Sequence, residues 1–432
     1  MKKIFFILLI LISSALAIVT FLFWRQIQDS ETIVYYPVPI EPSFIQLDER
    51  PIFGLKEYLR QVIDREMNKL KEEKQDFIYI DLQKMQLTLY QDGEALRSFL
   101  VAAKGAEWFM GKTPPGVYRV DSKSKLLFSS MGNVWMPYPI RFFGNYFIHG
   151  WPFDLAGQPV RREVSGGCVR LQTKDARALF EFAEVGMPIL IFDQIDQEYR
   201  TSLISLKTGV IVPPPQMSGD HILVADLDTG EILIDKDADS EVSAGPAATI
   251  MLALAASESV NLEKTIVARE WMFDGFHEGI IVPGRRYRAR DLLTPLITKS
   301  SREAGSVLSR FLTPNIFVDL MNQRARSIGL TNTVFADINS VSHYNITTLY
   351  DVAKLIRHIK TYRDFILEIS PRVSVIFPNN QYESAFVILK MREDDQSPVR
   401  SIFVGTMHSA DAEMDLQKIS VWLQSYFGLE LL

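Results

Sequence analysis

An apolar run without a single charged residue, Ile4 to Trp24, constrains this chain more than any other feature. It is long enough to cross a bilayer as one helix. Lys2 and Lys3 precede it, and positive residues favour the cytoplasmic side of a membrane. The sequence therefore predicts a single-pass protein of the cell membrane, whose domains after Arg25 lie outside the cytoplasm.

A cleaved signal peptide is the alternative, because Ala15-Leu16-Ala17 resembles a cleavage site. Cleavage there would leave a mature chain that begins with the rest of the apolar segment, Ile18 to Trp24. Such an end is unfavourable in water, so an uncleaved anchor is favoured.

Composition limits the classes of function. The 432 residues are 47% hydrophobic, which allows two or three domains with packed cores. A net charge of -6 without a long basic run argues against a nucleic-acid partner. The single cysteine cannot form an internal disulfide, so exported domains must depend on their cores alone. The six histidines are too scattered for a ligand cluster, and we expect no metal or other cofactor.

The first 75 residues contain no globular domain. We expect residues 1–30 to hold the cytoplasmic tip and the anchor, and residues 31–75 to form a stem, rich in proline and acidic residues, that ends in a spacer helix. That helix is predicted over Leu55 to Lys74, where apolar residues recur at three- and four-residue spacing.

The next segment, residues 76–193, is predicted to be a β-rich domain. Its hydrophobic period becomes two at Phe77, and an Asp-Gly turn at Asp92 joins two strands. A single helix is expected inside it, from Lys174 to Glu184.

A second domain, residues 220–432, follows a polar and proline-rich linker at residues 194–219. Strand patterns stand at both ends of this segment, and helical patterns dominate from Pro246 to Ile369. Strands that flank a helical middle favour a three-layer α/β/α arrangement.

The lone cysteine, Cys168, has surroundings suited to nucleophilic catalysis. Thiolate chemistry needs a lowered thiol pKa, a nearby base and donors for an oxyanion. Glycines before the cysteine let the backbone turn sharply, and Arg170 and the Arg161-Arg162 pair add positive charge that favours a thiolate. His149, at the end of a predicted strand, is the candidate base. A buried cysteine and a structural histidine are the alternative interpretation of these two residues.

The wider motif is His149-Gly150, fourteen residues, then Ser165-Gly166-Gly167-Cys168-Val169-Arg170-Leu171. It resembles the signature of the L,D-transpeptidase (YkuD) family. Thr113-Pro114-Pro115-Gly116 and Met136-Pro137-Tyr138 also resemble segments of that family. The resemblance covers roughly residues 76–192. One departure is Gly166, where many members have histidine, and we expect it to shift rate or selectivity.

The resemblance implies a role for each motif residue. Cys168 would be the nucleophile, His149 its base, and the Gly150 carbonyl the group that orients the imidazole. Backbone N–H groups of Gly167 and Cys168 would form an oxyanion hole. The residues expected to contact substrate are Ser165, Gly166, Arg170, Tyr138 and Trp135, the last two from an aromatic segment that either forms a lid or is ordinary core.

The implied reaction is acyl transfer on peptidoglycan stem peptides, which gives a 3→3 cross-link through a cysteine thioester. Hydrolysis of the same thioester would make the protein an L,D-carboxypeptidase, and the sequence leaves this open. A further alternative is a scaffold in which both domains bind the cell wall and neither catalyses.

The second domain resembles the penicillin-binding D-alanyl-D-alanine carboxypeptidases of family S11, with a β-lactamase-like fold. The likeness lies in segments such as Asp226-Leu227-Asp228-Thr229-Gly230 and Arg290-Asp291-Leu292-Leu293. That family needs Ser-x-x-Lys, and Ala248-Thr249-Ile250-Met251 stands in its place. Arg302 replaces the asparagine of Ser-x-Asn, and Arg372 to Glu383 lacks Lys-Thr-Gly. We therefore expect an inactive accessory domain that binds stem peptides or cell-wall proteins.

Overall fold

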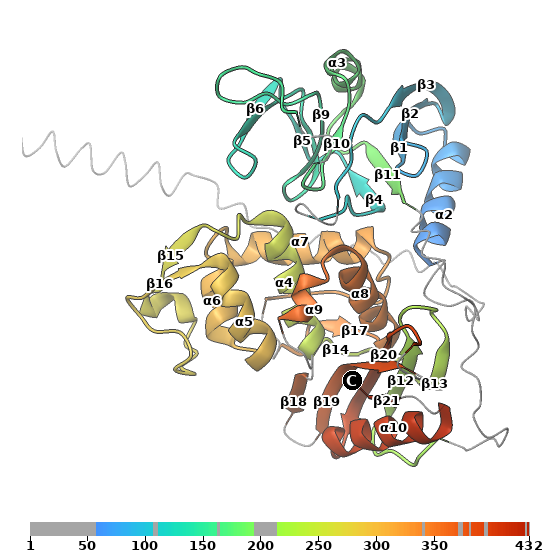
Figure 1. Cartoon of the computed structure of the whole chain (residues 1–432), viewed down its shortest axis with the longest axis vertical. Helices are drawn as coiled ribbons and strands as arrows, with labels where there is room; N and C mark the ends of the chain where they lie inside the picture. Colours follow the sequence, from blue (N-terminus) through green and yellow to red (C-terminus); the bar gives the residue numbers. More distant parts are fainter. Residues whose placement is uncertain are drawn as a thin grey trace, which may run out of the picture. The chain divides into compact units, whose positions relative to one another are not determined.

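The computed structural model describes residues 58–106, 111–161, 165–193, 214–338, 342–369, 375–379, 382–392, 396–427 and 430–431. The predicted anchor at 4–24 and most of the stem and linker lie outside the described residues. In the part that is described, no helix combines the length and the apolar character needed to cross a membrane. All described residues belong to one compact unit, residues 52–432 (Figure 1).

The first sheet is five-stranded and has the order β3-β2-β1-β11-β4. Its strands are β1 (Phe77–Asp81), β2 (Gln86–Gln91), β3 (Glu94–Leu100), β4 (Gly116–Arg119) and β11 (Pro188–Phe192). Only β1 and β11 run parallel. The predicted hairpin is confirmed, and Asp92 and Gly93 both have positive φ, as a two-residue hairpin turn of this kind requires.

Helix α2 (Tyr58–Glu72) confirms the predicted spacer helix over the described part of its range. Its apolar stripe packs on the first sheet, with Ile63 and Leu70 in one buried cluster with Phe77 and Leu190. This explains why the opposite face of the helix can be heavily charged.

A second sheet carries the cysteine motif. Its order is β10-β9-β8-β5, formed by β5 (Ser122–Lys123), β8 (Ile140–Phe143), β9 (Tyr146–His149) and β10 (Val169–Arg170). A separate hairpin joins β6 (Leu126–Ser129) to β7 (Val134–Pro137), and helix α3 (Thr173–Phe182) follows the motif near the predicted position.

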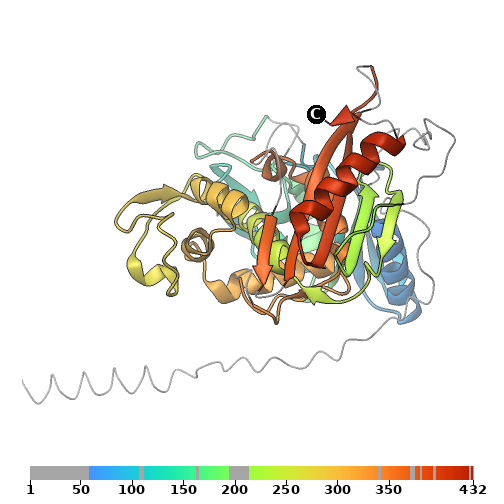
Figure 2. The same cartoon turned by 90° about the horizontal axis from the view of Figure 1, so that it is seen from below.

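The C-terminal segment contains a sheet with the order β13-β12-β20-β19-β18. These strands are β12 (His221–Asp226), β13 (Ile232–Lys236), β18 (Val375–Asn379), β19 (Tyr382–Arg392) and β20 (Arg400–Ser409), and β21 (Glu430–Leu431) pairs with β19. Helix α10 (Ala412–Phe427) covers one face, where Ile419 and Leu423 pack on Val224 and Val404 (Figure 2).

Helices cover the other face, so the predicted three-layer arrangement is confirmed for the described residues. They include α4 (Gly245–Ser259) and α8 (Leu349–Tyr362). The helical middle also contains α5 (Ala289–Lys299), α6 (Arg302–Ser309), α7 (Pro314–Ser327), α9 (Phe365–Glu368) and the short 3-10 helix η1 (Glu270–Phe273). Two small ladders complete it, β14 (Val242–Ser243) with β17 (Ile346–Thr347) and β15 (Thr265–Val267) with β16 (Arg286–Arg288).

Candidate active site

Parallel pairing of β9 with β10 brings the two candidate catalytic residues onto neighbouring strands. His149 ends β9, and its register partner is Arg170, two residues after Cys168. Cys168 and His149 line one cavity of about 750 Å³, together with Arg161, Gly166 and other residues. The candidate nucleophile and the candidate base expected from the sequence therefore line the same cavity.

The imidazole of His149 is held in one orientation. Its Nδ1 lies 2.6 Å from the carbonyl oxygen of Gly150, so Nδ1 carries the proton and donates it, and Nε2 is left as the basic atom. Burial lowers the pKa of His149 to about 4; the Gly150 hydrogen bond opposes this shift and the charge of Arg170 adds to it. The imidazole is therefore neutral near pH 7, as a general base must be. The catalytic role of this pair stays a prediction.

The thiol of Cys168 is also neutral at rest. Its Sγ donates to the carbonyl oxygen of Asn145 at 3.7 Å. Burial raises the pKa of Cys168 to about 11, against a backbone hydrogen bond from Phe147 and the charge of Arg170. The expectation of a lowered thiol pKa is thus wrong for the free protein, because desolvation of the thiolate outweighs the nearby arginine.

The turn before Cys168 is closed by the hydroxyl of Ser165. That hydroxyl accepts from the N–H of Gly167 at 3.2 Å and donates to the carbonyl oxygen of Cys168. Gly167 has φ of 119°, and a Cβ there would lie 2.4 Å from a ring carbon of Tyr146. The second glycine of the motif is therefore required by the backbone and by the aromatic ring beneath it.

The hydrogen bond within this turn affects the predicted oxyanion role of Gly167. Its N–H is bonded to Ser165 in the free protein, so an oxyanion would have to compete for that donor. Ser165 is itself 1% exposed and serves the turn, a role that the sequence did not suggest. The oxyanion hole and the substrate contact of Ser165 stay predictions.

The residues expected to contact substrate divide into two groups. Ser165, Gly166 and Arg170 line the Cys168 cavity, whereas Tyr138 and Trp135 are not among its lining residues. Tyr138 has φ of 51° and packs on Phe180 of α3, with ring centroids 5.7 Å apart. Trp135 packs on Phe128, with centroids 5.1 Å apart. The aromatic segment contributes other residues to the cavity, notably Leu127 and Phe128.

Asn145 is a site residue that sequence reasoning missed. It follows Gly144 in the turn between β8 and β9. Its backbone carbonyl oxygen accepts a hydrogen bond from the thiol of Cys168. A Gly-Asn pair between two apolar strands is a turn signal, and this is the only local sign of it. Among the described residues, no group of His, Cys, Asp or Glu is placed to hold a metal ion.

Each half of the chain matches a known protein family. Residues 75–191 match the L,D-transpeptidase catalytic domain (YkuD), and residues 208–392 match the D-alanyl-D-alanine carboxypeptidase family (peptidase S11). The chain has a transpeptidase-family domain followed by a carboxypeptidase-family domain. Both families act in peptidoglycan metabolism.

Curated relatives match the second half. A D-alanyl-D-alanine carboxypeptidase, DacB2, of Mycobacterium tuberculosis is 31% identical over 185 residues, which are 41% of this chain and 62% of the relative. A D-alanyl-D-alanine endopeptidase of Pseudomonas aeruginosa is 25% identical over 167 residues, 35% of this chain and 54% of the relative. The chain thus spans less than two thirds of the length of either relative. A solved D-alanyl-D-alanine carboxypeptidase from M. tuberculosis is 20% identical, with a TM-score of 0.41 over 49% of this chain and 92% of that one.

Ala248-Thr249-Ile250-Met251, where the sequence predicts the position of the family's serine–lysine pair, lies in helix α4. Helix α4 has no lysine anywhere along its length, and Ala248, Ile250 and Met251 are fully buried. Ser301 caps α6 and donates to Glu278 at 2.7 Å, while Arg302 binds the same carboxylate at 3.0 Å. The hydroxyl and the arginine therefore stabilise the helix start and its neighbouring loop.

Proposed function

We propose that this protein is a peptidoglycan L,D-transpeptidase that forms 3→3 cross-links between stem peptides through a thioester on Cys168. The observation that carries the proposal is the shared cavity of Cys168 and His149, with the imidazole oriented by Gly150. A neutral thiol and a neutral base in one cavity are a workable resting state, because the base removes the proton only as sulfur attacks.

The chemistry balances in two steps. Sulfur attacks the carbonyl carbon of the third stem residue, a C–S bond forms, and the C–N bond to the terminal D-alanine breaks. The thiol proton passes through His149 Nε2 to the departing amine. An amine of a second stem then attacks the thioester, so that a C–N bond forms, the C–S bond breaks, and the amine's proton returns through His149 to sulfur.

The carboxypeptidase-family domain is, in this proposal, an accessory domain without catalysis of its own. Support comes from the absence of lysine in α4 and from the burial of the apolar residues around Ala248. The proposal also includes the single-pass anchor at residues 4–24, supported by the uncharged apolar run and the lysines before it. Both folded domains would then lie outside the cytoplasm, beside peptidoglycan.

The test uses the full chain in detergent with a disaccharide-tetrapeptide, and reads products by mass spectrometry. We expect released D-alanine and cross-linked dimers from the wild type, and neither from Cys168→Ala. Tripeptide without dimers would replace the transpeptidase with a carboxypeptidase. Turnover by Cys168→Ala, or none by the wild type, would sink the proposal.

A second measurement concerns the accessory domain. The same two proteins are incubated with a fluorescent penicillin, and any adduct is mapped by peptide mass spectrometry. We expect no adduct within residues 214–432. A covalent adduct on a serine of that range would overturn the non-catalytic assignment.

A further inference from the structure

A second cavity, of about 610 Å³, adjoins the Cys168 cavity. Three residues line both of them: Met131, Asn145 and Gly166. Neither Cys168 nor His149 lines the second cavity, yet Gly166 stands only two residues from the nucleophile. A ligand in the second cavity would therefore lie next to the reacting centre without being attacked itself.

The walls of this cavity come from both domains. The transpeptidase-family domain contributes Gly111, Lys112 and Tyr146 beside the three shared residues. The carboxypeptidase-family domain contributes the end of α4, part of α5 and the α8–α9 junction. The volume lies within the range of about 300–1,000 Å³ that is typical of small-ligand sites. The accessory domain thus completes a chamber that the catalytic domain alone would leave open.

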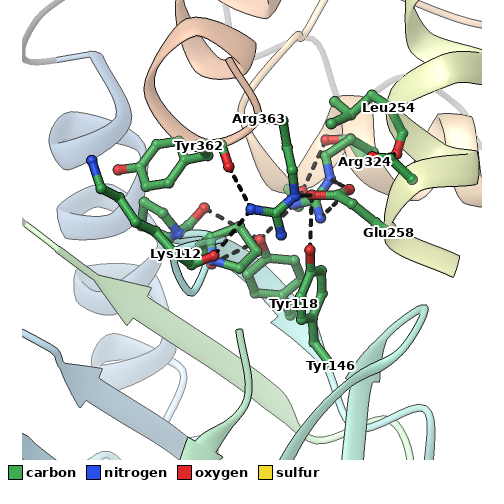
Figure 3. Close-up of polar contacts among 12 residues, drawn as sticks. Lys112, Tyr118, Tyr146, Leu254, Glu258, Arg324, Tyr362 and Arg363 are labelled. Atoms are coloured by element: carbon green, nitrogen blue, oxygen red, sulfur yellow. Dashed lines mark hydrogen bonds and ion pairs between the residues drawn. The ribbon is translucent and has the colours of Figure 1, made fainter. Parts of the chain in front are cut away.

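Arg363, at the end of α8, is buried in the wall of this cavity and is 3% exposed. Its Nη1 donates to the carbonyl oxygens of Lys112, at 3.3 Å, and of Tyr362, and its Nε lies 3.6 Å from Glu258 (Figure 3). Its Nη2 is buried and has no hydrogen-bond partner among the described residues. A buried guanidinium N–H without an acceptor is costly, so an acceptor brought by a ligand would be stabilised there.

The buried charges next to Arg363 are also unbalanced. Glu258 is bound by Arg324 at 2.6 Å, and both side chains are completely buried. Two guanidinium groups, Arg324 and Arg363, therefore share one buried carboxylate, which leaves a net positive charge there, while Lys112 and Asp364 in the cavity wall offset each other. Burial lowers the pKa of Arg363 only to about 10, so it stays charged at neutral pH. At the rim, Glu263 pairs with Arg290 at 2.7 Å and with Arg288 at 3.5 Å.

We infer that the second cavity binds the acyl acceptor, a stem peptide whose free carboxylate pairs with Arg363 across the domain boundary. The inference rests on the proposed function. The donor must occupy the Cys168 cavity, because its carbonyl has to reach sulfur, and the acceptor then approaches from the neighbouring chamber. Its amine would meet the thioester near Gly166, while its carboxylate satisfies the buried Nη2.

The first test compares acceptors. A tetrapeptide donor is combined with a tripeptide acceptor that ends in a carboxylate or in a carboxamide, and cross-linked product is divided by released D-alanine. We expect the full-length wild type to prefer the carboxylate by about tenfold or more, the effect of one charge-assisted hydrogen bond. Arg363→Gln should lose that preference, and because it is a ratio, partial loss of folding does not imitate it. Equal use of both acceptors by the wild type would overturn the inference.

The second test narrows the cavity. Thr294, on the exposed side of α5, lines the cavity, and Thr298, one turn further on, is equally exposed and does not. Thr294→Trp should raise the KM for acceptor at least tenfold, and Thr298→Trp should leave it unchanged. An unchanged KM in Thr294→Trp would remove the acceptor from this cavity. Absence of D-alanine release in the wild type would instead sink the proposed function, so the two failures are distinguishable.

Discussion

Burial decides how Cys168 rests in the free protein. It raises the pKa of Cys168 to about 11 and lowers that of His149 to about 4, and the two shifts act together against a preformed thiolate–imidazolium pair. The ion pair has to arise during attack, when a bound carbonyl takes up the negative charge.

This resting state predicts the pH dependence of Cys168 alkylation. A thiol with a raised pKa gains thiolate as pH rises, so the rate with iodoacetamide should increase about tenfold per pH unit from pH 7 to 10. The chain has one cysteine, so total alkylation by mass spectrometry reports on this residue alone. A rate that is already constant from about pH 7 would show a preformed thiolate and contradict the neutral pair.

The identity of these residues is predictable from sequence, and their electrostatics is not. The motif around Cys168 is contiguous, and His149 stands in a recognisable strand end. Desolvation, however, depends on what packs over the thiol, which includes Asn145 and the cavity wall. The nearby arginine was visible in the sequence, and the stronger opposing effect of burial was not.

At the scale of the element, the turn at residues 165–168 is shaped by one aromatic ring. Gly167 and Gly157 both have positive φ, 119° and 77°. An added Cβ at Gly167 would lie 2.4 Å from Tyr146, and one at Gly157 would meet nothing within 4 Å. Gly167 therefore carries two costs for a larger residue, a φ further from the left-handed region and the contact with the ring, whereas Gly157 carries only a milder backbone cost.

Gly167→Ala and Gly157→Ala are the matched variants. Gly157→Ala should destabilise by about 1 kcal/mol, the cost of a left-handed residue that is not glycine. Gly167→Ala should cost about 1–3 kcal/mol more, since its φ of 119° is less accessible to alanine and the Tyr146 ring must also move, and it should also lower cross-linking. Chemical denaturation of both proteins provides the comparison. Equal losses of stability would mean that neither the φ of Gly167 nor the Tyr146 ring opposes a larger residue there.

Regular elements are well predicted where the period is clear. Strand β1 occupies the range expected from the sequence, although its burial does not alternate, because α2 covers Phe77 on one face of the sheet and the main core covers Ile78 and Ile80 on the other. The aromatic segment shows the limit: Tyr138 was expected at the substrate and instead packs on Phe180, a contact between residues far apart in sequence. The pattern of apolar residues predicts which side chains are buried. It does not predict which side chain each of them contacts.

On the scale of the whole molecule, a buried polar cluster joins the two domains. Arg324 of α7 donates to Tyr118 of β4 at 2.7 Å and binds Glu258 of α4. The Asn145 N–H donates to the backbone carbonyl of Glu258 at 3.0 Å, so the same helix supports the turn beneath Cys168. No local pattern in the sequence marks these residues, because each finds its partner in the other domain or on another helix.

Arg324→Met tests whether this cluster makes the two domains one folding unit. Removing the arginine leaves the Glu258 carboxylate buried without its main partner, which should cost about 3–5 kcal/mol. The double variant with Glu258→Met should recover part of that loss, because the uncompensated charge is gone. Arg177→Met is the control: its pair with Glu181 is exposed, at 65% and 62%, and should cost under about 1 kcal/mol.

Denaturant unfolding measures how much stability each variant loses. Hydrogen exchange in each domain shows which elements lose protection. If the cluster couples the domains, Arg324→Met should lower protection in β9 and β10 as well as in α4 and α7, because the turn at Asn145 loses the support of Glu258. The Cys168 alkylation rate should rise in the same variant, since a loosened turn exposes the half-buried thiol further. If protection is lost only in α4 and α7 and the alkylation rate is unchanged, the accessory domain does not stabilise the turn at Cys168.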